Sequence, residues 1–203
     1  MAQVKYTKGA LREQQIRLTQ LQKYLPTLQL KKAMLQLEIN QVTLELEKLE
    51  GELSIAKTHV HKYEKLLTGT GARDLFDACH VHAVHKRFEN IAGVEIPIYE
   101  GIDFEKESYF LFDTPVWLES GILGVRHLIE LREKMEILRE KRRLLRKELR
   151  DVSIRVNLFE KIMIPRTESN IKGIKIFLGD QQLAAVSQAK ASKRKILERK
   201  KKS

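Results

Sequence analysis

The sequence predicts a mainly α-helical protein, in which two long helices form an antiparallel coiled coil and a small insertion containing a β-hairpin joins them. Two observations predict the helices, because apolar side chains recur at alternating steps of three and four residues in 1–67 and again in 121–187. A third predicts the insertion, since this spacing stops in 68–120 and short alternating runs replace it. Residues 188–203 form a basic tail.

The first helix is expected to extend from about Lys8 to Leu67 along one apolar seam. Only Lys32 interrupts this seam, and further leucines widen it, so that parts of the helix are expected to touch more than one neighbour. The widening leucines are Leu30, Leu37 and Leu44. The predicted core residues are Leu18, Leu21, Leu25, Leu28, Leu35, Ile39, Val42, Leu46, Leu49 and Leu53, and the seam continues through Ala56, Val60, Tyr63 and Leu67.

The insertion at 68–120 begins with a loop, TGTGARD, and then changes to strand-like patterns. CHVHAVHKRF, from Cys79 to Phe88, alternates as a strand does. The runs VEIPIYE, YFLF and VWLE are short enough to be further strands, because glycine, aspartate and proline separate them. Two long helices joined by such a compact segment most simply pack antiparallel.

The second helix is expected to begin near Gly121, and its seam becomes irregular around Pro165. Its predicted core residues are Leu131, Met135, Leu138, Leu145, Leu149, Val152, Val156 and Phe159, with Arg142 inside the seam. From Met163 to Ile171 the spacing needs two consecutive steps of four, which is a stutter that locally unwinds a left-handed supercoil. Because Pro165 lies inside the stutter, we predict that the helix continues through this proline with a bend.

A provisional register follows if the chain reverses between Leu67 and Gly124, because facing residues then have numbers that sum to about 190. This register pairs Pro26 with Pro165, Lys32 with Glu160, and Arg142 with Glu47 and Glu50. The two prolines would then lie at the same height along the coil, where each helix lacks a backbone hydrogen bond. The alternative for Lys32 and Arg142 is that their stems pack while their charges reach solvent.

The net charge of +11 is unevenly distributed and does not by itself indicate nucleic-acid binding. Residues 68–120 carry 4 Lys and Arg against 10 Asp and Glu, whereas 121–203 carry 23 against 10. Much of the excess lies in the tail from Lys190 to Ser203, where a solvated face is the simpler interpretation. No apolar run approaches the roughly 18 to 20 residues of a membrane span, so we expect no direct insertion into a membrane.

Motifs for catalysis or cofactor binding are weak. GTGARD lacks the GK[ST] ending of a phosphate-binding loop, and no Ser, His and acid arrangement can be recognised. The best metal candidate is the cluster Cys79, His80, His82 and His85, which has no second cysteine or spaced histidine pair to complete it. We therefore expect a non-catalytic protein without a cofactor or metal.

Three phrases resemble one family in the same order along the chain. YTKGAL at 6–11, FENIAGVEIP at 88–97 and RVNLFEKIMIPR at 155–166 are similar to the D subunit of the V-type and archaeal-type ATPases. The resemblance covers nearly the whole chain. It implies the central rotor stalk of a rotary motor, an axle whose paired helices stand inside a hexamer of catalytic and nucleotide-binding subunits, named A and B.

The same resemblance implies partners and contact residues. The partners would be the A, B and F subunits and an adaptor protein on the membrane ring, which places the chain in the cytoplasm, peripheral to the membrane. The motif positions that would contact the hexamer are Thr7, Lys8, Gly9, Arg155, Asn157, Glu160, Pro165 and Arg166. Direction of operation and the choice of proton or sodium stay open. The alternatives are a coiled-coil tether or scaffold and, last, a nucleic-acid-binding helical hairpin.

Overall fold

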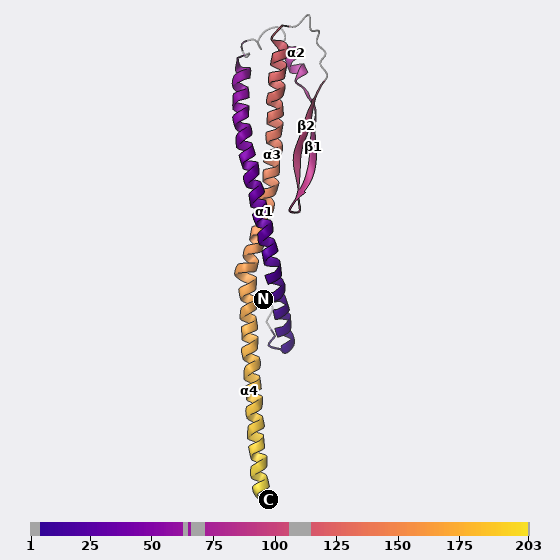
Figure 1. Cartoon of the computed structure of the whole chain (residues 1–203). Coiled ribbons are helices and arrows are strands. Elements are labelled where there is room, and N and C mark those ends of the chain that lie inside the picture. The colour runs from indigo at the N-terminus through magenta and orange to yellow at the C-terminus, as the bar shows by residue number, and fades with distance from the viewer. Residues whose placement is uncertain (1–4, 63–64, 66–71, 106–114, 203) are drawn as a thin grey trace. The chain divides into compact units, whose positions relative to one another are not determined.

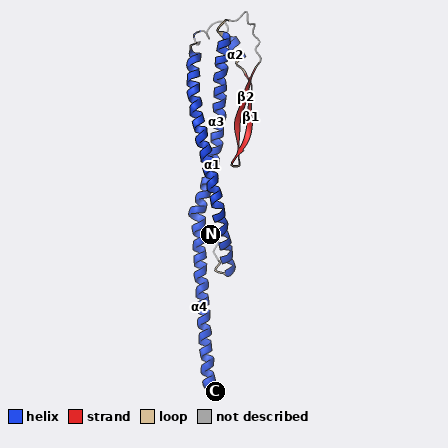
Figure 2. Ribbon diagram, in the orientation of Figure 1, coloured by secondary structure: helices blue, strands red, loops and turns tan. Residues whose placement is uncertain are grey.

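The computed structural model of the chain describes residues 5–62, 65, 72–105 and 115–202. Figure 1 shows the elements, which are α1 (Lys8–His61), α2 (Ala72–Ala78), β1 (Val81–Ile91), β2 (Val94–Phe104), α3 (Leu118–Leu158), the π-helical turn η2 (Phe159–Met163) and α4 (Ile164–Lys202). This confirms the mainly helical fold with an antiparallel hairpin between two long helical segments (Figure 2). Contacts divide the chain into a terminal unit, Met1–Leu30 with Val152–Ser203, and a middle unit, Lys31–Asp151.

The ends of α1 and α4 differ from the expected helix boundaries. α1 ends at His61 rather than Leu67, and the seam positions Tyr63 and Leu67 lie outside the described residues. At the other end of the chain, α4 continues to Lys202 without a break between 187 and 188. The basic tail therefore belongs to the helix.

In the middle unit, the seam residues of α1 and α3 are the ones removed from solvent. Leu35, Val42 and Leu145 have no exposed surface, and Ile39, Leu46, Leu131 and Met135 are also buried. The remaining predicted positions, Leu49, Leu53, Leu138 and Leu149, are half-buried. Because the apolar surface of these helices lies mostly along one stripe, burial of that stripe is the main term that holds the pair together.

The ion pairs of the middle unit show how α1 faces α3. Lys31 Nζ lies 2.6 Å from Glu148 Oε1, and Lys141 Nζ lies 2.6 Å from Glu38 Oε1, so the two helices are antiparallel. The predicted register is wrong, because it placed Lys31 opposite about residue 159, roughly eleven residues from its actual partner. Lys32 is exposed, and Arg139 rather than Arg142 approaches Glu50, at 3.7 Å.

In the terminal unit, α1 packs against the end of α3 and the first part of α4. Leu21, Val152, Val156, Ile171 and Ile174 are buried there, while Leu18, Leu25, Leu28 and Phe159 are half-buried. Tyr6 contacts Phe177, with ring centroids 5.2 Å apart, at the start of α1.

The two prolines do not form one level of the coil. One groove of the terminal unit is lined by Glu13 and Arg17 from α1 and by Ile162 and Arg166 from the other helix, so Pro165 lies near these α1 residues. Pro26 is nine residues beyond Arg17, which is about 14 Å along the helix. The paired-proline explanation of the bend is therefore wrong.

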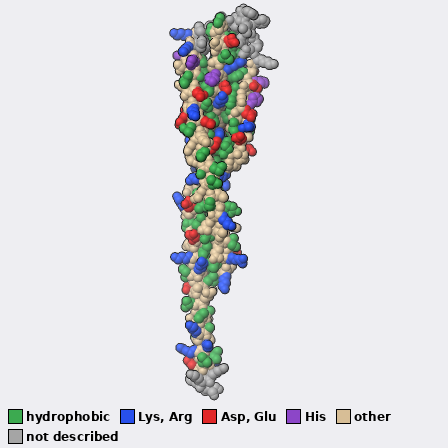
Figure 3. Space-filling model, in the orientation of Figure 1, with side chains coloured by type: hydrophobic (Ala, Val, Ile, Leu, Met, Phe, Trp, Pro, Cys, Tyr) green, Lys and Arg blue, Asp and Glu red, His purple; other side chains and the backbone are tan. Residues whose placement is uncertain are grey.

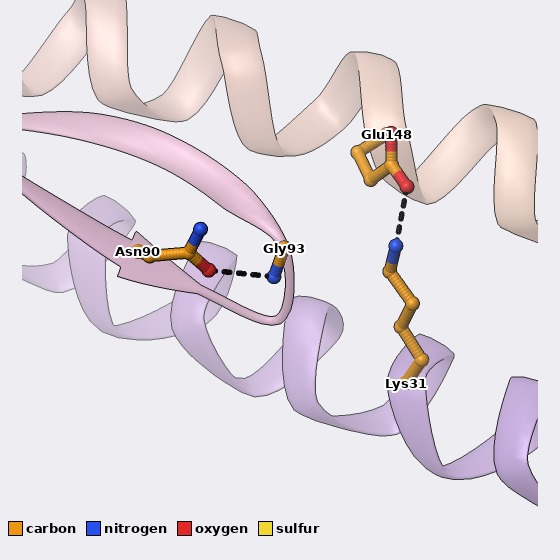
Figure 4. A network of polar contacts seen from close by, with 4 residues as sticks. All are labelled: Lys31, Asn90, Gly93 and Glu148. Atoms are coloured by element: carbon orange, nitrogen blue, oxygen red, sulfur yellow. Dashed lines mark hydrogen bonds and ion pairs between the residues drawn. The ribbon is translucent and has the colours of Figure 1, made fainter.

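The hairpin turns through two residues in the left-handed region. Ala92 has φ 52° and Gly93 has φ 80°, and Ile91 pairs with Val94 across the turn. These torsions are those of a type I′ turn, which matches the twist of the strands. Asn90 Oδ1 accepts a hydrogen bond from the Gly93 amide at 2.9 Å, and Figure 4 shows this turn beside the Lys31–Glu148 pair.

Of the three further strand-like runs, VEIPIYE lies in β2. YFLF falls at 109–112, outside the described residues. The expectation for VWLE is wrong, because Val116 and Trp117 form a turn and α3 begins at Leu118. Leu118 and Ile122 are both fully buried at helical spacing against Leu75 of α2, and this packing decides the conformation.

Polar contacts attach the hairpin to a second face of α3. Ile96 of β2 and Ile137 of α3 are buried, and Tyr99 OH donates to Glu130 Oε1 at 3.4 Å. Lys134 Nζ lies 5.1 Å from the Tyr99 ring centroid and 2.7 Å from Glu130 Oε1. The hairpin thus depends on one small charged cluster as well as on apolar burial.

This cluster predicts a pH window for attachment of the hairpin. Burial, and then the Glu130 charge, raise the pKa of Tyr99 to about 12. The hydrogen bond from Lys134 is the main cause that lowers the pKa of Glu130. Lys134 lies on α3 itself, so the lowered pKa of Glu130 does not depend on the hairpin. The raised pKa of Tyr99 favours the docked hairpin while the phenol is neutral. That contribution is lost as pH rises from about 10, the value for unfolded tyrosine, to about 12.

An ultraviolet titration of tyrosine ionisation in the chain and in its Tyr99→Phe variant tests this account. The chain has five tyrosines, so the difference between the two curves reports one phenol. We expect that phenol to ionise near pH 12. A difference curve centred near 10 would mean that Tyr99 is solvated and that the hairpin does not lie on α3 in solution.

Candidate interaction site

The motif residues expected to contact a partner lie on the surface of the terminal unit. Thr7, Gly9 and Arg166 line a common groove of about 880 Å³. The other positions, Lys8, Arg155, Asn157, Glu160 and Pro165, are exposed or half-exposed but do not line it. The full lining is Lys5, Thr7, Gly9, Ala10, Glu13, Gln14, Arg17, Leu158, Ile162, Met163, Arg166, Thr167 and Asn170.

One wall of the groove is the start of α1. Thr7 caps this helix, because its Oγ1 accepts a hydrogen bond from the Ala10 amide at 3.2 Å. The next residues that face the groove are small, and a Cβ atom added at Gly9 would meet nothing within 4 Å. The wall is therefore open rather than closely packed.

The opposite wall is the π-helical turn η2, and the spacing of buried residues explains why it forms there. Thr167 and Ile171 are buried, and Met163 is half-buried, at two successive steps of four. Val156 is buried seven residues before Met163, so these four positions span fifteen residues. Four turns of α-helix take about 14.4 residues, so the fifteen-residue span exceeds four turns by a fraction of a residue. A π-bulge inserts one residue, and Ile164 accordingly donates its amide hydrogen bond to Phe159 O.

Pro165 is the second residue after η2, and the helix continues through it as predicted. A proline has no backbone N–H, so it cannot donate a hydrogen bond to a carbonyl group of the preceding helical turn. The wide π turn leaves carbonyl groups of that turn without α-helical partners in any case. Thr167 is 4% exposed and donates its hydroxyl to Met163 O at 2.7 Å, a bond that commonly accompanies helix bending. These features concentrate irregular geometry at the groove.

The groove is basic, and its charges are not neutralised by the chain. Lys5, Arg17 and Arg166 line it together with one carboxylate, Glu13. None of these four side chains forms an ion pair with another described residue. An unpaired charge at a surface is available to a partner.

The metal candidate of the sequence is not assembled. Cys79 is buried among Leu75, Leu118 and Ile122, where its Sγ lies 3.9 Å from Ile122 O. His85 instead contacts Asp103, with Nε2 2.7 Å from Oδ2. Within the described ranges, no three His, Cys, Asp or Glu side chains are arranged to hold a metal ion.

Sequence reasoning missed much of the groove. Glu13, Gln14 and Arg17 were not singled out, although they repeat at helical spacing on the side of α1 that carries Ala10. Lys5 and Asn170 had no local signal at all. Their common location depends on the register of two helices, which the seam spacing does not determine.

These features define a protein of long paired helices with an exposed basic groove, and comparison with known proteins gives its family. The family model of the ATP synthase D subunit matches residues 10–194. The chain belongs to this family. It is 38% identical over 203 residues to the V-type ATP synthase D subunit of Chlamydia caviae, covering 100% of this chain and 98% of the relative.

Other relatives agree along the same length. The V-type ATP synthase D subunit of Chlamydia felis is 39% identical over 203 residues, with the same coverage of both chains. That of Chlamydia pneumoniae is 37% identical over 195 residues, which are 96% of this chain and 93% of the relative. None of the described helices has both the length and the apolarity needed to cross a membrane.

Proposed function

We propose that the chain is the central rotor axle of a V-type or archaeal-type rotary ATPase. The observation that carries the proposal is membership of the D-subunit family over residues 10–194. In this role the chain couples ATP hydrolysis or synthesis in the surrounding subunits to movement of protons or sodium ions through the membrane ring. The chain itself is non-catalytic and needs no cofactor.

The mechanism requires a shaft that resists torsion and presents different faces to its surroundings. Buried seams along α1, α3 and α4 supply stiffness, because twisting one helix past the other would expose apolar side chains. Ion pairs such as Lys31–Glu148 add specific contacts between the helices of the middle unit. The irregular turn at η2 makes the terminal unit asymmetric around its axis, so each orientation gives the enclosing subunits a different contact.

The proposed partners are those that membership of the D-subunit family implies. The A and B subunits enclose the terminal unit, where Thr7, Gly9 and Arg166 line the groove. The F subunit and the membrane-ring adaptor protein bind elsewhere on the chain, which places it in the cytoplasm at the membrane surface.

Co-purification tests the proposal. The chain, tagged at a surface position of the hairpin such as Glu95, is isolated from its native membranes with mild detergent, and the captured proteins are identified by mass spectrometry. We expect the A, B and F subunits in fixed stoichiometry. Recovery of the tagged chain from those membranes without A and B would contradict the proposal and favour a tether.

A further inference from the structure

We propose that the groove at η2 binds a segment that carries Asp or Glu next to an apolar side chain, supplied by the subunits that enclose the axle. This inference rests on the proposed function and specifies the chemistry of the contact. The occupant is a protein segment whose carboxylates meet Arg17 and Arg166, and whose apolar side chain meets the floor of the groove.

Positive charge is concentrated in the terminal unit. The terminal unit carries 18 Lys and Arg against 5 Asp and Glu, a net charge of +13. The middle unit carries 20 against 22, a net charge of −2. On the face seen in Figure 3, carboxylates mix with basic side chains over α3 and the hairpin, whereas basic side chains predominate over α4. Only the terminal unit has an excess for an acidic partner to neutralise.

The cations of the groove also lack the carboxylate partners that several cations of the middle unit have. In the middle unit, Lys31, Lys86, Lys134, Arg139 and Lys141 each lie within ion-pair distance of a glutamate. In the groove, Lys5, Arg17 and Arg166 have no carboxylate partner among the described residues, although Glu13 lines the same space. The groove therefore carries a net charge of +2 that no described carboxylate neutralises.

The groove also has apolar side chains beside its charges. Ile162 is 56% exposed and Leu158 is 40% exposed, and both line it beside the cations. Such partly exposed apolar side chains favour a protein partner that can cover them while placing carboxylates at the rim. A nucleic acid would use the cations but would gain less from the apolar floor.

The test compares two double charge reversals in the reconstituted complex of this chain with its A and B subunits. Arg17→Glu with Arg166→Glu alters the groove, and Lys172→Glu with Lys175→Glu makes the same change of net charge at exposed α4 positions outside it. We expect the groove variant to lose at least about tenfold in affinity for the A–B assembly and to bind with a weaker salt dependence. The matched variant should change less than about threefold.

A steric variant separates shape from charge. Gly9→Phe places a large side chain at the groove, and its Cβ atom would meet nothing within 4 Å in the free chain. We expect Gly9→Phe to weaken binding as the groove reversal does, while Gly9→Ala binds as the unmodified chain. Equal losses for the two charge reversals would show general electrostatic attraction and overturn the proposal, as would unchanged binding of both groove variants.

Crosslinking identifies the occupant. A photoreactive phenylalanine at Ile162 should capture an A or B peptide that contains at least one Asp or Glu beside an apolar residue. A captured peptide without a carboxylate, or capture of nucleic acid, would overturn the inference. Failure of the unmodified chain to join the A–B assembly at all is a different result, because it would refute the proposed function itself.

Discussion

Replacing Leu35 by alanine is expected to destabilise the folded chain by about 2 to 5 kcal/mol, measured by urea denaturation. Leu35 has no exposed surface and lies in the seam of the middle unit. Truncation removes the buried methyl groups and leaves a cavity that the close-packed seam around it closes only in part.

The matched control is Leu37→Ala, two residues further along the same helix. Leu37 is 58% exposed, so the same chemical change should cost less than about 0.5 kcal/mol. Equal costs at Leu35 and Leu37 would mean that α1 presents a different face to α3 in solution, and would contradict the packing described above.

Deleting Lys161 from η2 is the second change with a large expected effect. The deletion removes the extra residue, so the helix can keep its seam only by becoming α-helical through Pro165. A proline inside an α-helix costs about 3 kcal/mol or more. Keeping the π turn instead would move Thr167, Ile171 and Ile174 out of the seam, which is also unfavourable. We therefore expect a loss of stability of about 3 kcal/mol.

Adding Pro165→Ala to the deletion should restore most of the lost stability. An ordinary α-helix can then keep the apolar residues in the seam and also form its backbone hydrogen bonds. Pro165→Ala alone should retain η2, since the consecutive steps of four still require an extra residue. A double-mutant cycle by urea denaturation measures the coupling free energy between deletion of Lys161 and Pro165→Ala. If Pro165→Ala alone abolishes the π turn in a crystal structure, the proline rather than the seam spacing causes it.

The seams and the hairpin could be predicted because both signals are local. Alternation of apolar and polar residues identifies a strand without reference to its partner, as it did for most of β1 and β2. Three- and four-residue steps likewise identify the stripe that a helix buries. The two steps of four from Met163 to Ile171 indicated an irregularity that begins where η2 ends, although sequence spacing alone could not distinguish a π turn from gradual unwinding.

The register and the groove could not be predicted in the same way. Leucine seams repeat every seven residues, so sliding one helix along the other preserves most apolar contacts. The ion pairs Lys31–Glu148 and Glu38–Lys141 select one alignment, yet several other charges were equally plausible partners. The second buried face of α3, which includes Ile137, depends on where the hairpin docks and has no periodic signature.

Direct observation of rotation tests the central claim that this chain is an axle. The A–B assembly is fixed to a surface, and a bead is attached to the hairpin through Glu95→Cys, because Cys79 is the only native cysteine and is buried. On addition of ATP, the account predicts that the bead turns continuously in one direction and stops when ATP is exhausted. ATP hydrolysis at the normal rate by assemblies whose beads remain attached but do not rotate would contradict it.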